Sequence, residues 1–177
     1  SNILNNIKLN TGNFALVTLH RPSNVDCKDT IKEILNCLNL IQDNIDLVFP
    51  IHPRTFKNIK NFKLDNLLDS MPNLHLLDSV GYIDFLHLMN NSSFVLTDSG
   101  GIQEETTFLG VPCITLRENT ERPITINIGT NQLVKSDSES ILNSYNKIIN
   151  SKKKKNNIPE LWDGKASMRI VDVIESL

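Results

Sequence analysis

A glycine turn in the second half of the chain offers the clearest chemistry in the sequence. The apolar run Phe94–Leu96 leads into Asp-Ser-Gly-Gly at 98–101, and a helix is expected to follow at once, over Ile102–Leu109. Unpaired backbone N–H groups at a helix start sit at the positive end of its dipole and bind phosphate. Two glycines let an anion approach this backbone closely, and Ser99 adds a hydroxyl donor. The pattern predicts a phosphate-binding site.

Carboxylates follow the turn within the first helical turns. Glu104 and Glu105 are placed where they could hold the hydroxyl groups of a ribose or another sugar. A diphosphate beside sugar hydroxyls describes a nucleotide-sugar. The structural alternatives are an ordinary tight turn and a solvated helix face.

Three further polar motifs follow predicted strands. They are Thr-Leu-His-Arg-Pro-Ser-Asn-Val-Asp at 18–26, Pro-Ile-His-Pro-Arg-Thr at 50–55 and Arg-Glu-Asn-Thr-Glu-Arg-Pro at 117–123. Ligands of parallel α/β sheets bind beyond the carboxyl ends of the strands. These motifs should therefore meet the glycine turn at one edge of the sheet, whereas the opposite edge carries nothing similar.

Each side chain in these motifs also has a structural interpretation. His20 could bond a backbone carbonyl, and His52 with Arg54 could serve a helix start at Pro53. Arg122 could pair with a neighbouring glutamate, and the helical spacing of Phe85 fits a core residue as well as a ligand contact. For His75 and His87 we expect only structural roles.

Predicted strands and helices alternate along the chain. Strands that are apolar throughout, separated by helices, predict an α/β fold with a Rossmann-like, doubly wound parallel sheet of about six strands. The expected strands are Phe14–Leu19, Ile45–Ile51, Leu74–Leu77, Phe94–Thr97, Pro112–Leu116 and Gln132–Val134. The expected helices span about 29–42, 53–61, 82–90, 102–109, a segment ending near 150, and 164–177.

Two helix starts and one helix face are specified further by the sequence. Thr30 with Glu33, and Ser136 with Glu139, have the spacing of capping boxes. The last helix is expected to bury an apolar stripe made of Ala166, Ile170, Val173, Ile174 and Leu177.

Composition limits the remaining possibilities. The 177 residues suffice for one domain, and a net charge of -2 gives no general attraction to nucleic acid. The run Lys152–Lys155 is expected to be a solvated loop. No apolar stretch approaches the ~20 residues of a membrane span, and no signal peptide is recognisable. Three widely spaced cysteines fit reduced thiols of a cytoplasmic protein better than a disulfide frame or a metal site.

Common catalytic and cofactor motifs are missing from the sequence. There is no Gly-x-Gly-x-x-Gly after the first strand, so we expect no NAD site. A Walker loop and the Gly-x-Ser-x-Gly elbow of hydrolases are also absent, because Ser99 lies in Asp-Ser-Gly-Gly.

At these motifs the chain resembles the non-hydrolysing UDP-N-acetylglucosamine 2-epimerases. The four polar motifs carry the resemblance, in order and at family-like spacing, and Gly-Thr-Asn at 129–131 and Trp-Asp-Gly-Lys-Ala at 162–166 add to it. The similarity covers almost the whole chain. Members of this family have two Rossmann-like domains facing a cleft, the GT-B architecture. The chain resembles the C-terminal domain only, preceded by a helical entry at Ile3–Leu9, so residues 1–177 are expected to form one nucleotide-sugar-binding domain.

The resemblance implies roles for particular residues. It implies that His20 is catalytic, that Ser99, Gly100 and Gly101 hold the diphosphate, and that Glu105 takes the ribose hydroxyls. Phe85 would pack near the uracil, and the other cleft residues would be Arg21, His52, Arg54 and Arg122.

The resemblance also implies a reaction and its partners. UDP is eliminated to give a 2-acetamidoglucal and is then added back with inversion at C2, without a redox cofactor or a metal. The essential carboxylates of the family belong to the N-terminal domain, which this sequence does not include, so this chain alone is expected to be inactive. The full-length enzyme is expected to be a cytoplasmic homodimer serving surface polysaccharide synthesis, with a UDP-sugar as substrate.

Two departures from the family pattern leave the sugar open. His-Pro-Arg-Thr at 52–55 stands where some members have His-x-Asn-Pro, and resembles a subgroup that includes epimerases of modified sugars. Val134-Lys135 stands where Val-Gly is common. Two alternatives remain: the donor-binding domain of a GT-B glycosyltransferase, against which His-Arg-Pro at 20–22 argues, and a stand-alone, non-catalytic UDP-binding domain.

Overall fold

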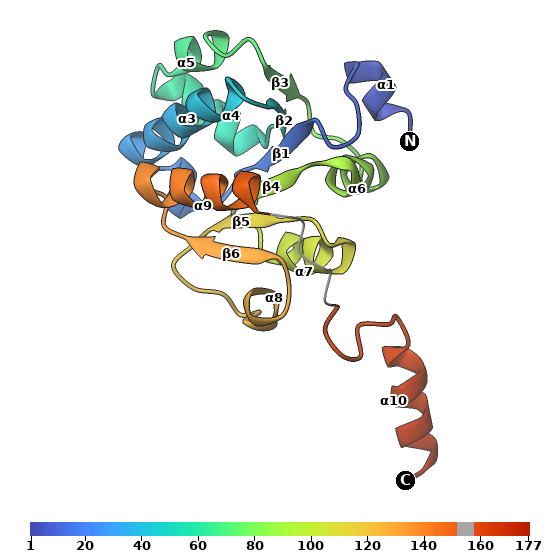
Figure 1. Ribbon diagram of the computed structural model, residues 1–177. Coiled ribbons are helices and arrows are strands. Elements are labelled where there is room, and N and C mark those ends of the chain that lie inside the picture. The colour runs from blue at the N-terminus through green and yellow to red at the C-terminus, as the bar shows by residue number, and fades with distance from the viewer. Residues whose placement is uncertain (152–157) are drawn as a thin grey trace.

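A six-stranded parallel sheet forms the centre of the molecule, with helices on both of its faces (Figure 1). The computed structural model describes residues 1–151 and 158–177. The strand order is β3-β2-β1-β4-β5-β6, and every neighbouring pair is parallel. The strands are β1 Phe14–Thr18, β2 Asp46–Pro50, β3 Leu74–Leu77, β4 Phe94–Thr97, β5 Cys113–Leu116 and β6 Asn131–Val134. The predicted Rossmann-like parallel sheet is confirmed.

The strand order reverses between β1 and β4. The chain first builds the sheet outward through β2 and β3, then returns to the other side of β1 for β4, β5 and β6. Such a switch point opens a crevice at the carboxyl ends of the two central strands, which is where ligands of this fold bind. The loops that follow β1 and β4 therefore border this crevice.

Ten helices occur in the described residues. They are α1 Ile3–Ile7, α2 Pro22–Val25, α3 Lys28–Gln42, α4 Pro53–Asn61, α5 Asp65–Asp69, α6 Tyr82–Asn91, α7 Gly100–Leu109, α8 Ile124–Asn127, α9 Ser138–Asn150 and α10 Ala166–Glu175. The predicted long helices are all present within two or three residues of their expected bounds. The short helices α2, α5 and α8 were not predicted.

The two faces of the sheet bury separate apolar clusters. Ala15 and Val17 of β1 pack with α3, α4 and α9, whereas Phe14 and Leu16 pack with α1, α6 and α7. This alternation follows from the period of two residues in a strand. Because both faces are covered, the central strands are mostly apolar, which is the pattern that predicted them, whereas the edge strands β3 and β6 carry His75, Asn131 and Gln132.

Both predicted capping boxes are wrong in detail. Cys27 is the N-cap of α3 and makes no side-chain cap bond, and the Glu33 carboxylate instead accepts the backbone N–H of Ser138 at 2.8 Å. The N-cap of α9 is Asp137, which accepts the N–H of Ser140 at 2.8 Å. A tertiary contact between α3 and α9 thus takes the carboxylate that local spacing assigned to a cap.

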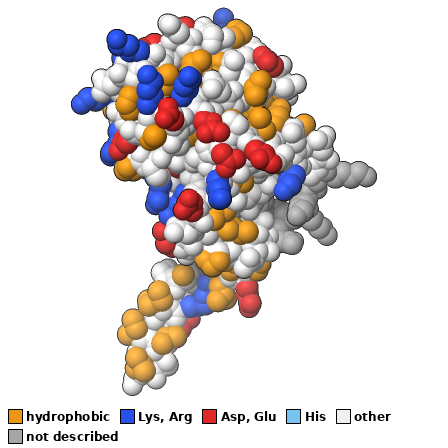
Figure 2. Space-filling view, turned by 90° about the vertical axis from the view of Figure 1, so that its left-hand side faces the viewer, with side chains coloured by type: hydrophobic (Ala, Val, Ile, Leu, Met, Phe, Trp, Pro, Cys, Tyr) orange, Lys and Arg blue, Asp and Glu red, His pale blue; other side chains and the backbone are white. Residues whose placement is uncertain are grey.

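The prediction that the last helix buries its apolar stripe is also wrong. No residue of α10 is buried, and the helix lies apart from the sheet (Figure 1). Its apolar side chains form a visible exposed patch (Figure 2), made up of Met168, Ile170, Val171, Val173 and Ile174. Periodicity identifies an amphipathic helix but not the surface that covers it.

The loop predicted at Lys152–Lys155 lies outside the described residues. No helix in the described part of the chain is long and apolar enough to cross a membrane.

Candidate functional site

The loops after β1 and β4 lie side by side at the switch point. Thr18 and Thr97, the last residues of these strands, are register partners. The backbone therefore brings His20 and the glycine turn to the same place, although they are about 80 residues apart in sequence. The sequence prediction that these motifs share one edge follows from the strand order.

Two arginines lie beside the glycine turn at the start of α7, and we call this group, made up of Ser99, Gly100, Gly101, Arg117 and Arg122, the anion seat. Ser99 is the N-cap of α7 and its side chain makes no cap bond, so the hydroxyl is not committed to the helix. A Cβ atom at Gly100 would lie 3.3 Å from Nη1 of both Arg117 and Arg122. Two guanidinium groups and the free N–H groups of a helix start thus face the same space, as anion binding requires.

Each of the two guanidinium groups forms an ion pair with a glutamate. Arg117 donates from Nη1 and Nη2 to Glu121 at 3.1 and 2.8 Å, and its side chain is only 4% exposed. Arg122 Nε lies 2.7 Å from Glu104. The hydrogen bonds from Arg117 are the main reason that the pKa of Glu121 falls to about 2. These pairs orient the arginines before any ligand arrives, which lowers the entropic cost of binding.

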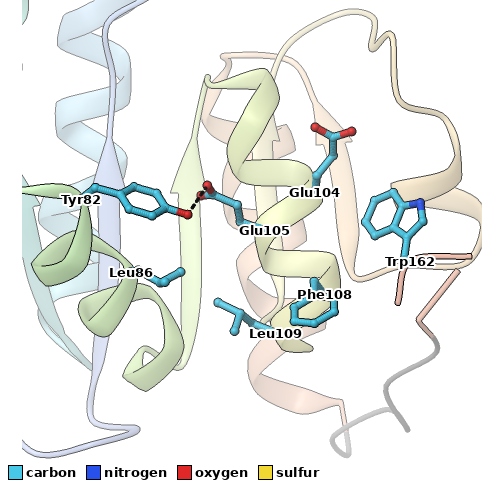
Figure 3. A pocket seen from close by; sticks show the side chains of 7 residues that line it. All are labelled: Tyr82, Leu86, Glu104, Glu105, Phe108, Leu109 and Trp162. Carbon is cyan, nitrogen blue, oxygen red and sulfur yellow. Dashed lines mark hydrogen bonds between the residues drawn. The ribbon is translucent and has the colours of Figure 1, made fainter. Parts of the chain in front are cut away.

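Glu105 has a different partner, on the neighbouring helix. The hydroxyl of Tyr82 on α6 donates to Glu105 Oε1 at 3.2 Å across the gap between α6 and α7 (Figure 3). The charge of Glu105, with this hydrogen bond, raises the pKa of Tyr82. Below this pair lies a groove of about 430 Å³ with mostly apolar walls, lined by Tyr82, Leu86, Glu104, Glu105, Phe108, Leu109 and Trp162 (Figure 3). Glu104 points away from Glu105 (Figure 3) and pairs with Arg122.

Two histidine rings meet beside the anion seat. The ring centroids of His20 and His52 are 5.7 Å apart and the rings are tilted by 42°. His20 Nδ1 lies 2.9 Å from a carboxylate oxygen of Asp98, which is fully buried. His52 is the N-cap of α4, and its Nδ1 accepts the backbone N–H of Arg54 at 3.2 Å. His52 thus has the helix-start role that the sequence offered as the structural alternative, and still faces His20.

The structure places the remaining predicted residues less directly. Arg54 binds Asp26 through two side-chain hydrogen bonds, so its guanidinium group is committed to a neighbouring loop. The charge of Arg21 helps to lower the pKa of Glu121, the carboxylate that pairs with Arg117 and Arg122. Phe85 is partly buried against the apolar cluster under α6. His20, His52, the glycine turn, Glu105 and Arg122 are therefore gathered, and Arg54 is held aside.

Three residues of this edge were not proposed from the sequence. Asp98 contacts His20, Tyr82 donates a hydrogen bond to Glu105, and Arg117 lies beside Gly100. Asp98 and Arg117 stand directly after strands, which was the available signal, but only the fold shows that their side chains turn inward. From the helical spacing of its segment we expected Tyr82 to be buried; this was wrong, because the residue is 61% exposed and its hydroxyl bonds Glu105.

The chemistry of the edge is that of anion and proton handling. It offers guanidinium groups and helix N–H groups to a phosphate, a carboxylate to hydroxyl groups, and a histidine to a proton transfer. Among the described residues, no group of three His, Cys, Asp or Glu side chains could hold a metal ion. A Rossmann-like sheet with an anion seat at its switch point is typical of nucleotide-binding domains.

Comparison with known proteins identifies the family. The model of the UDP-N-acetylglucosamine 2-epimerase family matches residues 1–175, and the chain belongs to this family. The UDP-N-acetylglucosamine 2-epimerase of Methanococcus maripaludis is 40% identical over 163 residues, covering 91% of this chain and 44% of that protein. The UDP-2,3-diacetamido-2,3-dideoxy-D-glucuronate 2-epimerase of Pseudomonas aeruginosa is 39% identical over 132 residues, covering 74% of this chain and 36% of that protein.

Solved structures agree with this assignment. The crystal structure of Methanocaldococcus jannaschii UDP-GlcNAc 2-epimerase in complex with UDP-GlcNAc and UDP superposes with a TM-score of 0.85 at 38% identity, covering 100% of this chain and 49% of that one. The Escherichia coli heptosyltransferase WaaC shares only the fold, with a TM-score of 0.55 at 15% identity over 94% of this chain and 45% of that one. The chain spans about half the length of the relatives it matches.

Proposed function

We propose that this chain is the UDP-binding C-terminal domain of a UDP-N-acetylglucosamine 2-epimerase with GT-B architecture. The observation that carries the proposal is the anion seat, where two guanidinium groups lie 3.3 Å from the Cβ position of Gly100 at the start of α7. A diphosphate placed there gains charge-assisted hydrogen bonds on both sides. The family membership and the UDP complex of the M. jannaschii enzyme support the same ligand.

The rest of the nucleotide follows from the diphosphate position. Glu105 lies on the turn of α7 after the anion seat, so its carboxylate is placed to accept the ribose hydroxyls. Phe85 on α6 then offers a ring to the uracil. Arg21 and His52 line the side of the crevice that faces His20, and Arg54, bound to Asp26, contacts the substrate less directly than we expected from the sequence.

The proposed reaction is the interconversion of UDP-N-acetylglucosamine and UDP-N-acetylmannosamine, or of a related modified sugar. UDP leaves C1 as the C2 proton is removed, and it adds back to C1 as a proton that has exchanged with solvent is delivered to the opposite face of C2. His20 lies beside the anion seat, where it can neutralise charge on the departing diphosphate. The Pseudomonas relative acts on a diacetamido uronate, which supports keeping the class of substrate at UDP-2-acetamido sugars.

The proposal assigns half of the active site to residues outside this chain. Moving the C2 proton requires an acid and a base on opposite faces of the sugar, and one wall of a cleft supplies only one side. The shares of 44% and 49% covered in the relatives support a second domain of similar size. The exposed apolar patch on α10 fits a surface that this domain covers. We further propose a homodimer of the full-length enzyme acting in the cytoplasm, where its three free thiols stay reduced.

Exchange of the C2 proton tests the proposal. UDP-N-acetylglucosamine incubated in D2O with the full-length enzyme should take up deuterium at C2, seen as loss of the C2 proton signal by NMR. The 177-residue chain alone should bind UDP and catalyse no uptake. Uptake by the chain alone would show that the carboxylates are assigned to the wrong domain, and no uptake by the full-length enzyme would contradict the epimerase itself.

A further inference from the structure

Asp98 is a buried carboxylate, and its hydrogen-bond donors all belong to residues 20–24, which follow β1. It is fully buried and accepts the backbone N–H groups of His20 at 3.0 Å and Arg21 at 2.9 Å. The side-chain amide of Asn24 approaches it at 3.3 Å, and His20 Nδ1 at 2.9 Å. A buried carboxylate is costly unless donors surround it, and here each donor comes from the segment that carries His20.

These partners decide where the proton of the neutral His20 ring lies. A neutral imidazole has one N–H, and a carboxylate that already accepts three N–H groups can only accept from Nδ1. His20 therefore carries its proton on Nδ1 and leaves Nε2 with a free lone pair. The His20 side chain is 41% exposed, so Nε2 remains accessible at the ligand edge.

His52 has the opposite arrangement. Its Nδ1 accepts the backbone N–H of Arg54, so the proton of its neutral ring lies on Nε2. The two neighbouring rings therefore differ in what they present to a ligand. His52 offers a donor, whereas His20 offers a base that becomes a donor once it is protonated.

We propose that Asp98 is the positioning residue of the catalytic histidine. It holds His20 with Nδ1 bound and Nε2 free, and it stabilises the imidazolium form. This inference rests on the proposed function. When the C1–O bond of the substrate breaks and its electron pair passes to the diphosphate oxygen, protonated His20 gives its Nε2 proton to that oxygen. Asp98 stays ionised throughout, as the carboxylate of a serine-protease triad does.

The position of Asp98 in the chain strengthens this role. It directly precedes Ser99, the first residue of the anion seat, so the residue that binds the His20 loop is joined to that seat by one peptide bond. The distance between the proton donor and the diphosphate is thus fixed by one buried residue rather than by two independent loops. The rate of proton transfer falls steeply when the donor and the acceptor are less precisely positioned.

Histidine-selective nitrogen NMR on the 177-residue chain tests the tautomer, at a pH where the rings are neutral. Wild type should show His20 protonated on Nδ1. Asp98→Asn should move this proton to Nε2, because the asparagine oxygen is claimed by the backbone N–H groups and its NH2 group then donates to Nδ1. The matched control is Asp46→Asn, since Asp46 contacts His75 Nε2 at 2.9 Å, and it should leave the His20 signals unchanged.

Turnover of the full-length enzyme tests the consequence. Asp98→Asn should lower kcat by roughly 10²–10⁴-fold, the range for general acid–base groups, with KM changed by less than about threefold. The double variant with His20→Ala should be no slower than His20→Ala alone, because Asp98 acts through His20.

Three results would overturn the inference. A wild-type His20 protonated on Nε2 would do so whether or not the variant folds. Near-normal turnover of Asp98→Asn, or losses that multiply in the double variant, would reduce Asp98 to a structural residue. Failure of the wild-type chain to bind UDP is a separate outcome: it overturns the proposed function, and with it the catalytic role given to Asp98.

Discussion

Removing the guanidinium group of Arg122 should weaken diphosphate binding selectively. A hydrogen bond to a charged group contributes about 1.5–3 kcal/mol, and a tenfold change in affinity corresponds to about 1.4 kcal/mol. The Arg122 side chain is 34% exposed and already pairs with Glu104 at 2.7 Å and Glu121 at 3.7 Å. Solvent and these carboxylates screen its charge, so we take the lower end of the range. Arg122→Met should therefore weaken UDP binding by roughly tenfold.

Calorimetric titration with UDP, UMP and uridine provides the measurement. Uridine affinity should change by less than about twofold in Arg122→Met, since only the diphosphate meets the anion seat. The matched control is Arg169→Met on α10. Its side chain is 37% exposed and likewise pairs with a carboxylate, that of Asp163 at 3.0 Å, but it belongs to α10, which lies apart from the sheet (Figure 1). An equal loss for UDP and uridine, or no loss for either, would refute the assignment of Arg122 to the diphosphate.

Four other predictions follow from the same geometry. His20→Ala in the full-length enzyme should lower kcat by roughly 10²–10⁴-fold with little change in UDP affinity, and steady-state kinetics with normal turnover would reduce His20 to a positioning residue. Tyr82→Phe removes a hydrogen bond whose net contribution is about 0.5–1.5 kcal/mol. In competition titrations it should reduce the preference for UDP over 2′-deoxy-UDP by roughly threefold. An unchanged preference would show that Tyr82 has no part in ribose binding. Gly100→Ala should weaken UDP binding more than Gly101→Ala. The added methyl group at Gly100 would press on both guanidinium groups, whereas a Cβ at Gly101 meets nothing within 4 Å. The reverse order would show that the diphosphate does not bind at the anion seat. The pKa of Glu121 is lowered from 4.5 to about 2, so its contribution to stability is complete above pH 4.5 and is lost as the pH falls toward 2. Glu121→Gln should flatten this part of the acid unfolding curve. An identical curve for the variant would show that the ion pair does not stabilise the fold.

The sheet could be predicted from the sequence because its signals are local. The central strands β1 and β4 are short, buried apolar runs that end at a threonine, which is the pattern of strands covered on both faces. Polar residues do occur in other strands: Thr115 in β5 is buried, and His75 in the edge strand β3 is only partly buried. The edge of the site followed from the rule that ligands bind at the carboxyl ends of strands. That rule placed His20 and the glycine turn together before any strand order was known.

Side-chain pairing could not be predicted in the same way. Glu33 has the spacing of a cap but binds Ser138, which lies 105 residues further along the chain. Arg54 follows a strand as expected, yet Asp26 takes its charge. Asp98 was read as part of a turn, whereas it is the buried partner of His20. In each case a tertiary contact decides between alternatives that local spacing leaves equal.

The prediction that the apolar face of α10 is buried was wrong for a related reason. Its apolar residues recur at helical spacing, which predicts a buried stripe in any helix that packs on its own domain. In this chain the stripe is exposed, with Met168 63% and Ile174 63% accessible. A sequence pattern specifies that a surface needs a partner, and it does not specify whether that partner lies within the same domain.

A crystal structure of the 177-residue chain with UDP tests the central claim most directly. We expect the diphosphate at the start of α7, with its oxygens within hydrogen-bond distance of Arg117 or Arg122 and of the N–H groups at Gly100 and Gly101. The ribose hydroxyls should contact Glu105. A diphosphate bound away from α7, or a ribose that leaves Glu105 bound only to Tyr82, would contradict the account.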